Sequence, residues 1–195
     1  MFKVLIVTIL FICETFAQNS FISYYVFKWG AERPDIVERY LKKGATGKDK
    51  NPTSCYILGS LYLYGVFLKK DLKEANRYIT MAADLKLPAA INSIGDGYYS
   101  GDIRVKDVDM ALKFYKKAAK TGFGPAQFNA GVVLLRNYKN KDDLKKSILY
   151  LGKASKNYGD LGEIAKAAEQ YKLEAEIKLK RLIEMKKKTS AKQTS

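Results

Sequence analysis

The chain has 195 residues, of which 47% are hydrophobic and 28% are charged, a balance typical of a folded globular protein. Its formal net charge of +15 predicts attraction to acidic proteins or anionic surfaces. The absence of histidine excludes a Ser-His-Asp or Cys-His catalytic site, a histidine general base and a His-ligated zinc site.

The N-terminus has the pattern of a cleaved signal peptide over residues 1–17. Lys3 supplies a positive charge, residues 4–13 form an apolar run, and Thr15 and Ala17 are small residues at the positions that a signal peptidase reads. The apolar run is too short to span a bilayer, which needs about 20 residues. We therefore expect export, to the periplasm or out of the cell.

Two other readings of this segment remain open. It could be a buried N-terminal helix, or a lipoprotein signal ending at Cys13, although Ile12 is bulky where such processing needs a small residue. Removing residues 1–17 leaves Cys55 as the single cysteine, which excludes an internal disulfide. Cys55 then either packs near a helix start or forms an intermolecular disulfide.

Residues 18–53 are interpreted as an N-terminal cap. Residues 21–30 and 34–44 could form a shortened helix pair, since a proline at position 34 suits a first helical turn. Residues 22–27 would equally suit a strand. The polar residues 45–52 are predicted to form a turn.

An internal repeat of 36 residues occupies the middle of the chain. The predicted copies are 54–89, 90–125 and a more degenerate 126–159. Its recurring positions are Gly59, Gly95 and Gly131; Gly65, Gly101 and Asn137; Asp71, Asp107 and Asp143; Ala75, Ala111 and Ser147; and Tyr78, Phe114 and Tyr150.

Each copy reads as two helices, A and B. In the first copy, Asn51 and the following proline indicate the start of helix A, which runs to about Tyr64. Gly65 ends it, and Gly101 and Asn137 are the matching residues. All three are residue types that tolerate the left-handed conformation a helix C-terminus often needs. Asp71 is predicted to cap helix B with Glu74 completing a capping box, and Asp107 and Asp143 occupy the same position in the later copies.

A glycine recurs inside each helix A. A helix-interior glycine costs about 1 kcal/mol relative to alanine, so its repetition predicts a compensating close contact with helix B. The residues expected to face these glycines are the small ones at Ala75, Ala111 and Ser147.

After the repeats, residues 160–188 show apolar residues at three- and four-residue steps, which predicts one long helix. Such a helix would cover the open end of a helical stack. Residues 189–195 are predicted to be a disordered tail.

The repeated residues resemble Sel1-like repeats, relatives of the tetratricopeptide repeat. The first copy carries Leu58-Gly59, Tyr62, Gly65, Asp71, Ala75, Tyr78 and Ala82-Ala83, and the second carries the equivalent pattern from Ala90 to Ala119. The third copy departs from the pattern at Leu134, Asn137, Ser147 and Ser155. The resemblance implies an all-α fold, a short α-solenoid of helix pairs closed by the C-terminal helix. It also implies roles such as adaptor, host-interaction factor or immunity protein in bacteria.

Helix A also carries positions outside the motif, and these vary between copies. They are expected to line the concave face of the solenoid, and their aromatic residues and arginine are typical interface anchors. The predicted protein-binding residues are Tyr56, Leu63, Tyr64, Asn92, Asp96, Tyr99, Phe128, Val132 and Arg136. Ser60, Ser100 and Leu135 share these register positions.

The functional expectation is a non-enzymatic exported protein that binds an acidic protein partner. One alternative is a periplasmic immunity protein that neutralises a secreted toxin or lipase. Another is a binder of membrane surfaces or envelope ligands through the basic C-terminal helix. An enzyme acting on cell-wall sugars is a further alternative. It would need a closely spaced pair of carboxylates, and the sequence gives no hint of one. We expect no cofactor, no metal and no nucleic-acid partner.

Overall fold

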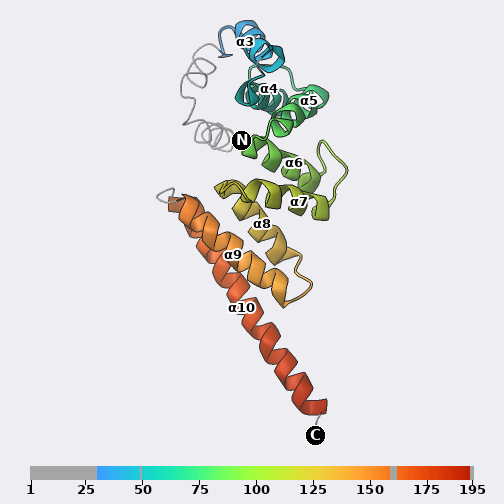
Figure 1. The fold of residues 1–195 in the computed structure, drawn as a ribbon, viewed down its shortest axis with the longest axis vertical. Helices are drawn as coiled ribbons and strands as arrows, with labels where there is room; N and C mark the ends of the chain where they lie inside the picture. The colour runs from blue at the N-terminus through green and yellow to red at the C-terminus, as the bar shows by residue number, and fades with distance from the viewer. Residues whose placement is uncertain (1–29, 49, 159–161, 194–195) are drawn as a thin grey trace. The chain divides into compact units, whose positions relative to one another are not determined.

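The computed structural model describes residues 30–48, 50–158 and 162–193, with side chains described up to residue 189. These residues form eight α-helices and no strand (Figure 1). The all-α prediction is confirmed. Among the helices of the described part, none is long and apolar enough to cross a membrane. The predicted signal peptide and residues 18–29 of the predicted cap lie outside the described residues.

The chain divides into two compact units, Met1–Ala90 and Ile91–Ser195. In the first unit, α3 (Pro34–Thr46) packs on α4 (Pro52–Tyr64), and α4 packs on α5 (Leu72–Asp84). α3 contributes Val37 and Leu41 to the core, and both side chains are buried. The second helix of the predicted cap is therefore present.

The ends of α4 are fixed by the expected residues. The Asn51 side chain accepts hydrogen bonds from the backbone N–H groups of Thr53 and Ser54, at 2.9 and 3.0 Å. At the other end Gly65 has a φ of +68°, the left-handed conformation that glycine adopts without strain. Gly101 closes its helix in the same way, with a φ of +86°.

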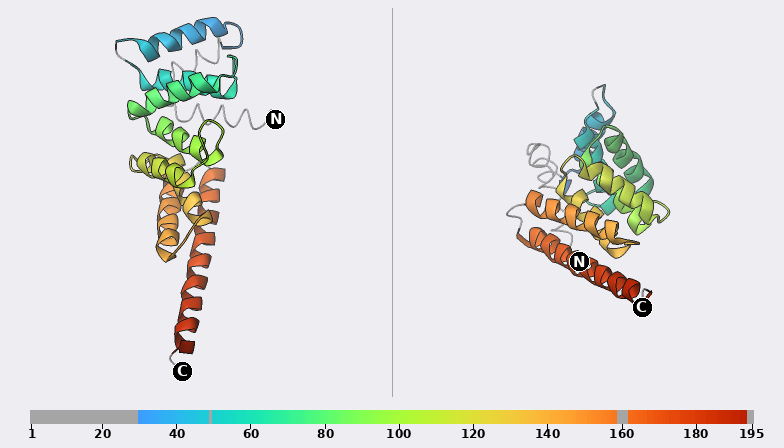
Figure 2. Two further views of the ribbon diagram at one scale, coloured as in Figure 1. Left: turned by 90° about the vertical axis from the view of Figure 1, so that its right-hand side faces the viewer. Right: turned by 60° about the horizontal axis from the view of Figure 1, so that its bottom comes forward.

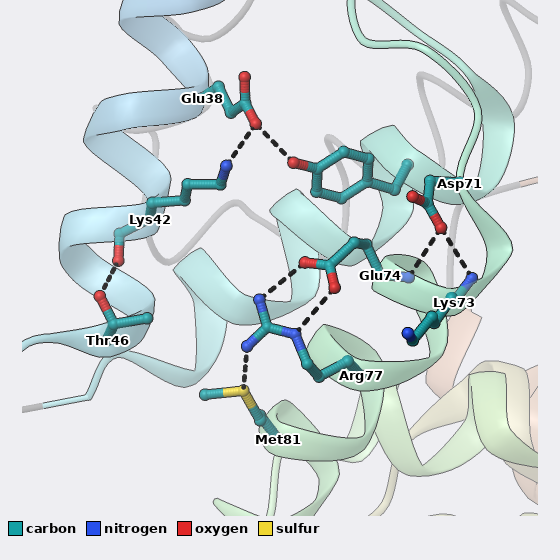
Figure 3. Close-up of polar contacts among 9 residues, drawn as sticks. Glu38, Lys42, Thr46, Asp71, Lys73, Glu74, Arg77 and Met81 are labelled. Carbon is teal, nitrogen blue, oxygen red and sulfur yellow. Dashed lines mark hydrogen bonds and ion pairs between the residues drawn. The ribbon is translucent and has the colours of Figure 1, made fainter.

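The cap of α5 differs in part from the predicted capping box (Figure 3). Asp71 caps the helix as expected, accepting from the backbone N–H groups of Lys73 and Glu74 at 2.9 and 3.0 Å. The Glu74 carboxylate instead pairs with Arg77, 2.7 Å away. The Asp71 N–H that a capping box would satisfy already donates to the carbonyl of Tyr62 at 3.0 Å, so Glu74 is released for the ion pair.

The second unit holds the rest of α6 (Pro88–Ser100), which begins in the first unit, followed by α7 (Val108–Ala119) and α8 (Gly124–Arg136). Two longer helices, α9 (Lys141–Tyr158) and α10 (Gly162–Gln193), complete it. α7 packs on α8 and α8 on α9, while α10 packs mainly along α9. α10 continues past the beginning of α9, as Figure 1 and the left view of Figure 2 show. Together these features confirm a short helix-pair solenoid with a long terminal helix.

Two apolar clusters stabilise the second unit. One gathers Ala111 and Tyr115 of α7 with Ala130 and Val133 of α8. The other joins Leu135 of α8 with residues of α9 and α10, namely Leu144, Ile148, Tyr171, Ala175, Leu179 and Leu182. The C-terminal helix is therefore part of the core of this unit from Tyr171 to Leu182.

The recurring glycines do mark close helix contacts, but the residue that fills the contact differs from the predicted one. A Cβ at Gly59 would lie 2.8 Å from Ile79 Cγ1, and one at Gly131 would lie 2.6 Å from Leu151 Cγ. At Gly95 the nearest atom would be Tyr115 Cε1, at 2.6 Å. These distances are shorter than a real Cβ tolerates.

The predicted small residues contribute in another way. The Ala75 carbonyl oxygen would lie 3.2 Å from a Cβ at Gly59, so alanine allows the backbones to approach. In the third copy the buried Ser147 hydroxyl donates to the carbonyl of Gly131 at 2.8 Å. In this copy serine stands where the other two have alanine, and its hydroxyl adds a hydrogen bond between α9 and α8 at the same contact.

The third copy differs from the first two at Asn137, and the cap predicted at Asp143 is wrong. Asn137 has a φ of −120° rather than a left-handed conformation, and its side-chain amide donates to the carbonyl of Val133 at 2.9 Å. Asp143 does not cap α9, because the helix begins earlier, at Lys141. Asn140 caps it instead, accepting from the backbone N–H groups of Asp142 and Asp143 at 2.8 and 3.1 Å.

The predicted disordered tail begins too early. α10 extends to Gln193, so residues 189–193 are helical. The Thr189 hydroxyl donates to the carbonyl of Met185 one turn earlier, at 3.0 Å. Lysine, alanine and glutamine are good helix formers, and the sequence contains no breaker here.

Cys55 packs at the start of α4. Its side chain is fully buried, and its sulfur lies 3.8 Å from the carbonyl oxygen of Ala45. Burial raises the pKa of the thiol. Local unfolding would therefore have to precede an intermolecular disulfide.

Candidate functional site

The predicted binding residues of the first unit all lie on α4. Tyr64 is 51% exposed, while Tyr56 and Leu63 are half-buried. Ser60, which shares their register, is buried, and its hydroxyl donates to the carbonyl of Tyr56 at 2.8 Å. Tyr64 thus offers the largest accessible surface of this group.

The predicted residues of the second copy form a hydrogen-bonded network on α6. Asn92 is buried, and its amide Nδ2 donates to Asp96 Oδ2 at 3.0 Å. Asp96 is exposed, and Tyr99, one turn further along, is 40% exposed. The structure therefore brings all three residues to one part of the second unit.

Two residues from neighbouring helices complete the network. The Tyr115 hydroxyl of α7 donates to Asp96 Oδ1 at 2.8 Å. The Asn129 amide of α8 donates to the same oxygen and to Asn92 Oδ1, both at 3.2 Å. Three helices thus converge on one carboxylate, and this group of Asn92, Asp96, Tyr115 and Asn129 is called the Asp96 network.

Sequence reasoning missed Tyr115 and Asn129. A signal existed for Tyr115, because Ile79 and Leu151 occupy the same repeat position in the other copies. A buried tyrosine in place of an aliphatic residue brings a hydroxyl that needs a hydrogen-bond partner. No comparable signal distinguishes Asn129, which lies beside the predicted Phe128.

The surroundings of Asp96 change its acidity. Desolvation by the packed helices raises its pKa from 3.8 to about 6, although the hydrogen bond from Tyr115 opposes this shift. Burial and the nearby carboxylate raise the pKa of Tyr115 in turn. Asp96 is nevertheless exposed to solvent.

The predicted residues of the third copy meet the C-terminal helix. The rings of Phe128 and Tyr171 lie edge to face, with centroids 5.7 Å apart. The Arg136 guanidinium is 5.5 Å from the Tyr171 ring centroid and 4.0 Å from the Glu174 carboxylate. These side chains already have intramolecular partners on α10.

Two further residues of this copy are less accessible than predicted. Val132 is half-buried. Leu135, which shares the register of the binding residues, is fully buried in the core. It is therefore not on a binding face, because α9 and α10 cover it.

Within the described ranges, no three His, Cys, Asp or Glu side chains gather in a way that could hold a metal ion. The Asp96 network offers a single carboxylate surrounded by amides and a hydroxyl. Its chemistry is that of hydrogen bonding and charge recognition.

A comparison with known protein families finds the same repeat that the helix pairs show. The sequence model of the Sel1 repeat matches residues 52–87 and 88–123, and it does not extend to the third predicted copy. No curated protein matches the sequence.

Two solved structures share the fold. A Sel1 repeat protein from Oxalobacter formigenes is 26% identical, with a TM-score of 0.56, over 71% of this chain and 98% of that one. A protective antigen of uropathogenic Escherichia coli strains with an SLR fold is 24% identical, with a TM-score of 0.57. That match covers 72% of this chain but only 33% of the antigen. The chain is therefore a helical solenoid protein whose residues 52–123 match the Sel1 repeat.

Proposed function

We propose that this protein is a non-enzymatic binding module that recognises a protein partner with the accessible side chains of its A helices. Sel1 repeats are generally protein-interaction modules. The observation that carries the proposal is that Asp96 and Tyr99 are both exposed on α6, a helix whose residues before Asp96 are buried or half-buried.

The division of labour within α6 supports this proposal. Gly95 and Ile94 are buried and belong to the repeated packing pattern. Asp96 and Tyr99 vary between the copies and are accessible. A repeat scaffold needs only its packing residues to fold, so the remaining positions are free to determine recognition.

The partner is proposed to be acidic overall. The net charge of +15 draws an acidic protein toward this chain and speeds association. Export through the signal peptide at residues 1–17 would place the encounter in the periplasm or outside the cell. An adaptor, a host-interaction factor and an immunity protein against a secreted toxin or lipase are all compatible with this arrangement.

A photo-crosslinking amino acid at position 99 tests the proposal in cells of the source organism. We expect it to capture a defined protein partner. The matched control places the same residue at Leu149 of α9, which is 56% exposed and lies outside the predicted face. Equal capture from both positions, or none from position 99, would contradict the proposal.

A second candidate function uses the C-terminal helix. Leu173 and Ile177 lie one turn apart on α10 and are 57% and 44% exposed. Further along the same helix, Lys186, Lys187 and Lys188 form an exposed lysine cluster. Exposed apolar residues beside lysines favour binding to an anionic membrane surface. This candidate is proposed as an alternative to the protein partner.

Vesicles of phosphatidylglycerol and phosphatidylcholine distinguish the two candidates. Strong sedimentation with the vesicles, lost when the three lysines become glutamine, would favour the membrane surface. The control replaces Lys141, Lys145 and Lys146 of α9, which are also exposed, and removes the same charge elsewhere. If the protein partner is correct, neither triple variant abolishes its binding, and each mainly slows association.

A further inference from the structure

Asp96 lacks an ion-pair partner in a chain rich in cations. Lys and Arg number 35 against 20 Asp and Glu, yet within the described residues no Lys or Arg pairs with this carboxylate. Desolvating an unpaired carboxylate costs free energy. A tyrosine hydroxyl needs only one acceptor, and a neutral side chain could supply it. The need to satisfy Tyr115 therefore does not account for a charge at this position.

The donors of the Asp96 network are largely used within it. The Asn129 amide donates both of its hydrogens, to Asn92 Oδ1 and to Asp96 Oδ1. The Asn92 amide and the Tyr115 hydroxyl also donate to Asp96. The opposite orientation of the Asn129 amide would place its oxygen against the carboxylate, so the contacts determine which atom is nitrogen.

The remaining capacity of the network is for accepting hydrogen bonds. Asn129 Oδ1 accepts none from the part of the chain that the structure describes, and Asp96 Oδ2 accepts one, from Asn92. A carboxylate oxygen can accept two, and an amide oxygen can do the same. A ligand that fits must therefore donate hydrogen bonds, and the carboxylate favours a donor that carries positive charge.

An aromatic side chain lies beside these acceptors. Tyr99 follows Asp96 by three residues on α6, which places both on the same side of the helix. Tyr99 is also one of the groups that raise the pKa of Tyr115, after burial and Asp96. Its 40% exposure leaves ring surface accessible. A guanidinium group stacks on aromatic rings and donates several hydrogen bonds from one plane.

We propose that Asp96, Asn129 and Tyr99 form a binding site for a guanidinium group, an arginine side chain of the partner polypeptide. The inference rests on the proposed function, because it assigns the ligand class of the same face. It is compatible with an acidic partner, since the net charge acts at long range and Asp96 acts on one side chain in contact. Such a site would add specificity to an association driven by opposite net charge.

A blocked tripeptide, acetyl-Gly-Arg-Gly-amide, is the probe, and the full-length protein labelled with ¹⁵N is the target. We expect the side-chain amide signals of Asn92 and Asn129 to shift saturably on titration. The same peptide with citrulline has a side chain of the same shape but lacks the charge and replaces two of the five N–H donors with a carbonyl oxygen, so it should bind about tenfold more weakly. Equal binding of the two peptides, or no shift with the arginine peptide, would overturn the inference.

Two variants locate the site. Asp96→Asn should lose the preference for arginine over citrulline, while Asp84→Asn should keep it, because Asp84 is an exposed carboxylate on α5. An arginine preference that survives in a folded Asp96→Asn protein would overturn the assignment. If Asp96→Asn does not fold, the comparison of the two peptides on the unmodified protein still decides. The probe needs no native partner, so its failure is distinct from a failure of crosslinking at position 99.

Discussion

The Tyr115 hydroxyl on α7 donates a hydrogen bond to Asp96 Oδ1 on α6, with 2.8 Å between the two oxygens. The Tyr115 ring also covers Gly95, where a Cβ would lie 2.6 Å from Cε1. One side chain thus fills the close helix contact of the second copy and positions the carboxylate beside it. The packing of the repeat and the candidate site are linked through this residue.

Replacing Tyr115 with phenylalanine separates these two roles. The ring still fills the contact, so we expect the melting temperature to change little. The hydrogen bond lowers the pKa of Asp96, so its loss should raise that pKa above about 6. Carboxyl ¹³C shifts followed through a pH titration give the midpoint, and an unchanged midpoint would show that the hydrogen bond is absent in solution.

The pH dependence of stability should report Asp96 directly. Its pKa is about 6 in the folded protein and 3.8 as the reference value, so the folded state binds the proton more tightly. The stabilisation that Asp96 contributes is therefore complete below pH 3.8, and it is lost as the pH rises through about 6. Tyr115, which donates to Asp96, stays protonated over this range because its pKa is raised above its usual value.

Asp96→Asn isolates this contribution from those of the other carboxylates. Urea unfolding at pH 4 and pH 7 should show the variant gaining stability relative to the unmodified protein as the pH rises. Parallel pH profiles for the two proteins would contradict the raised pKa. Far-ultraviolet circular dichroism confirms that both begin from the same helical fold.

The close contact in the third copy predicts a large effect of a single methyl group. Gly131→Ala would place a Cβ 2.6 Å from Leu151 Cγ and 3.2 Å from the Leu151 backbone nitrogen. We expect a loss of about 1–3 kcal/mol in the free energy of unfolding, because the backbone of α9 must move. Denaturant unfolding measures this loss.

Gly152→Ala is the matched control, since this glycine also lies inside a helix. Its Cβ would meet only the Lys172 side chain, at an ordinary 3.7 Å. Alanine should therefore stabilise α9 by up to about 1 kcal/mol through helix propensity alone. If both variants lose the same stability, close packing does not explain the recurring glycines.

The repeat made most of the fold predictable from the sequence. Gly65 and Asp71 lie at positions where only a few residue types satisfy the backbone, so both helix ends are found where the pattern predicts them. The third copy was less predictable because more than one of its residues is able to cap the helix. Asn140 takes the cap position that the register assigns to Asp143, and the register alone does not reveal this.

The candidate site was predictable only in part, for a related reason. Register identifies which residues of one helix point away from the motif, and it selected Asp96 and Tyr99 correctly as accessible side chains. It does not show which side chains of other helices reach them, so Asn129 was missed. It also does not show that α10 packs against Phe128 and Arg136, because that contact depends on the path of a helix outside the repeat.

Tyr99 tests the central claim most directly, once a partner is identified by crosslinking. Tyr99→Ala removes an accessible anchor from α6, and its affinity for the partner should fall by about 2 kcal/mol or more, roughly 30-fold in Kd. The melting temperature should stay nearly unchanged, because Tyr99 is 40% exposed. Titration calorimetry with the purified partner measures the change. An unchanged Kd in a folded Tyr99→Ala protein would contradict partner binding through this face.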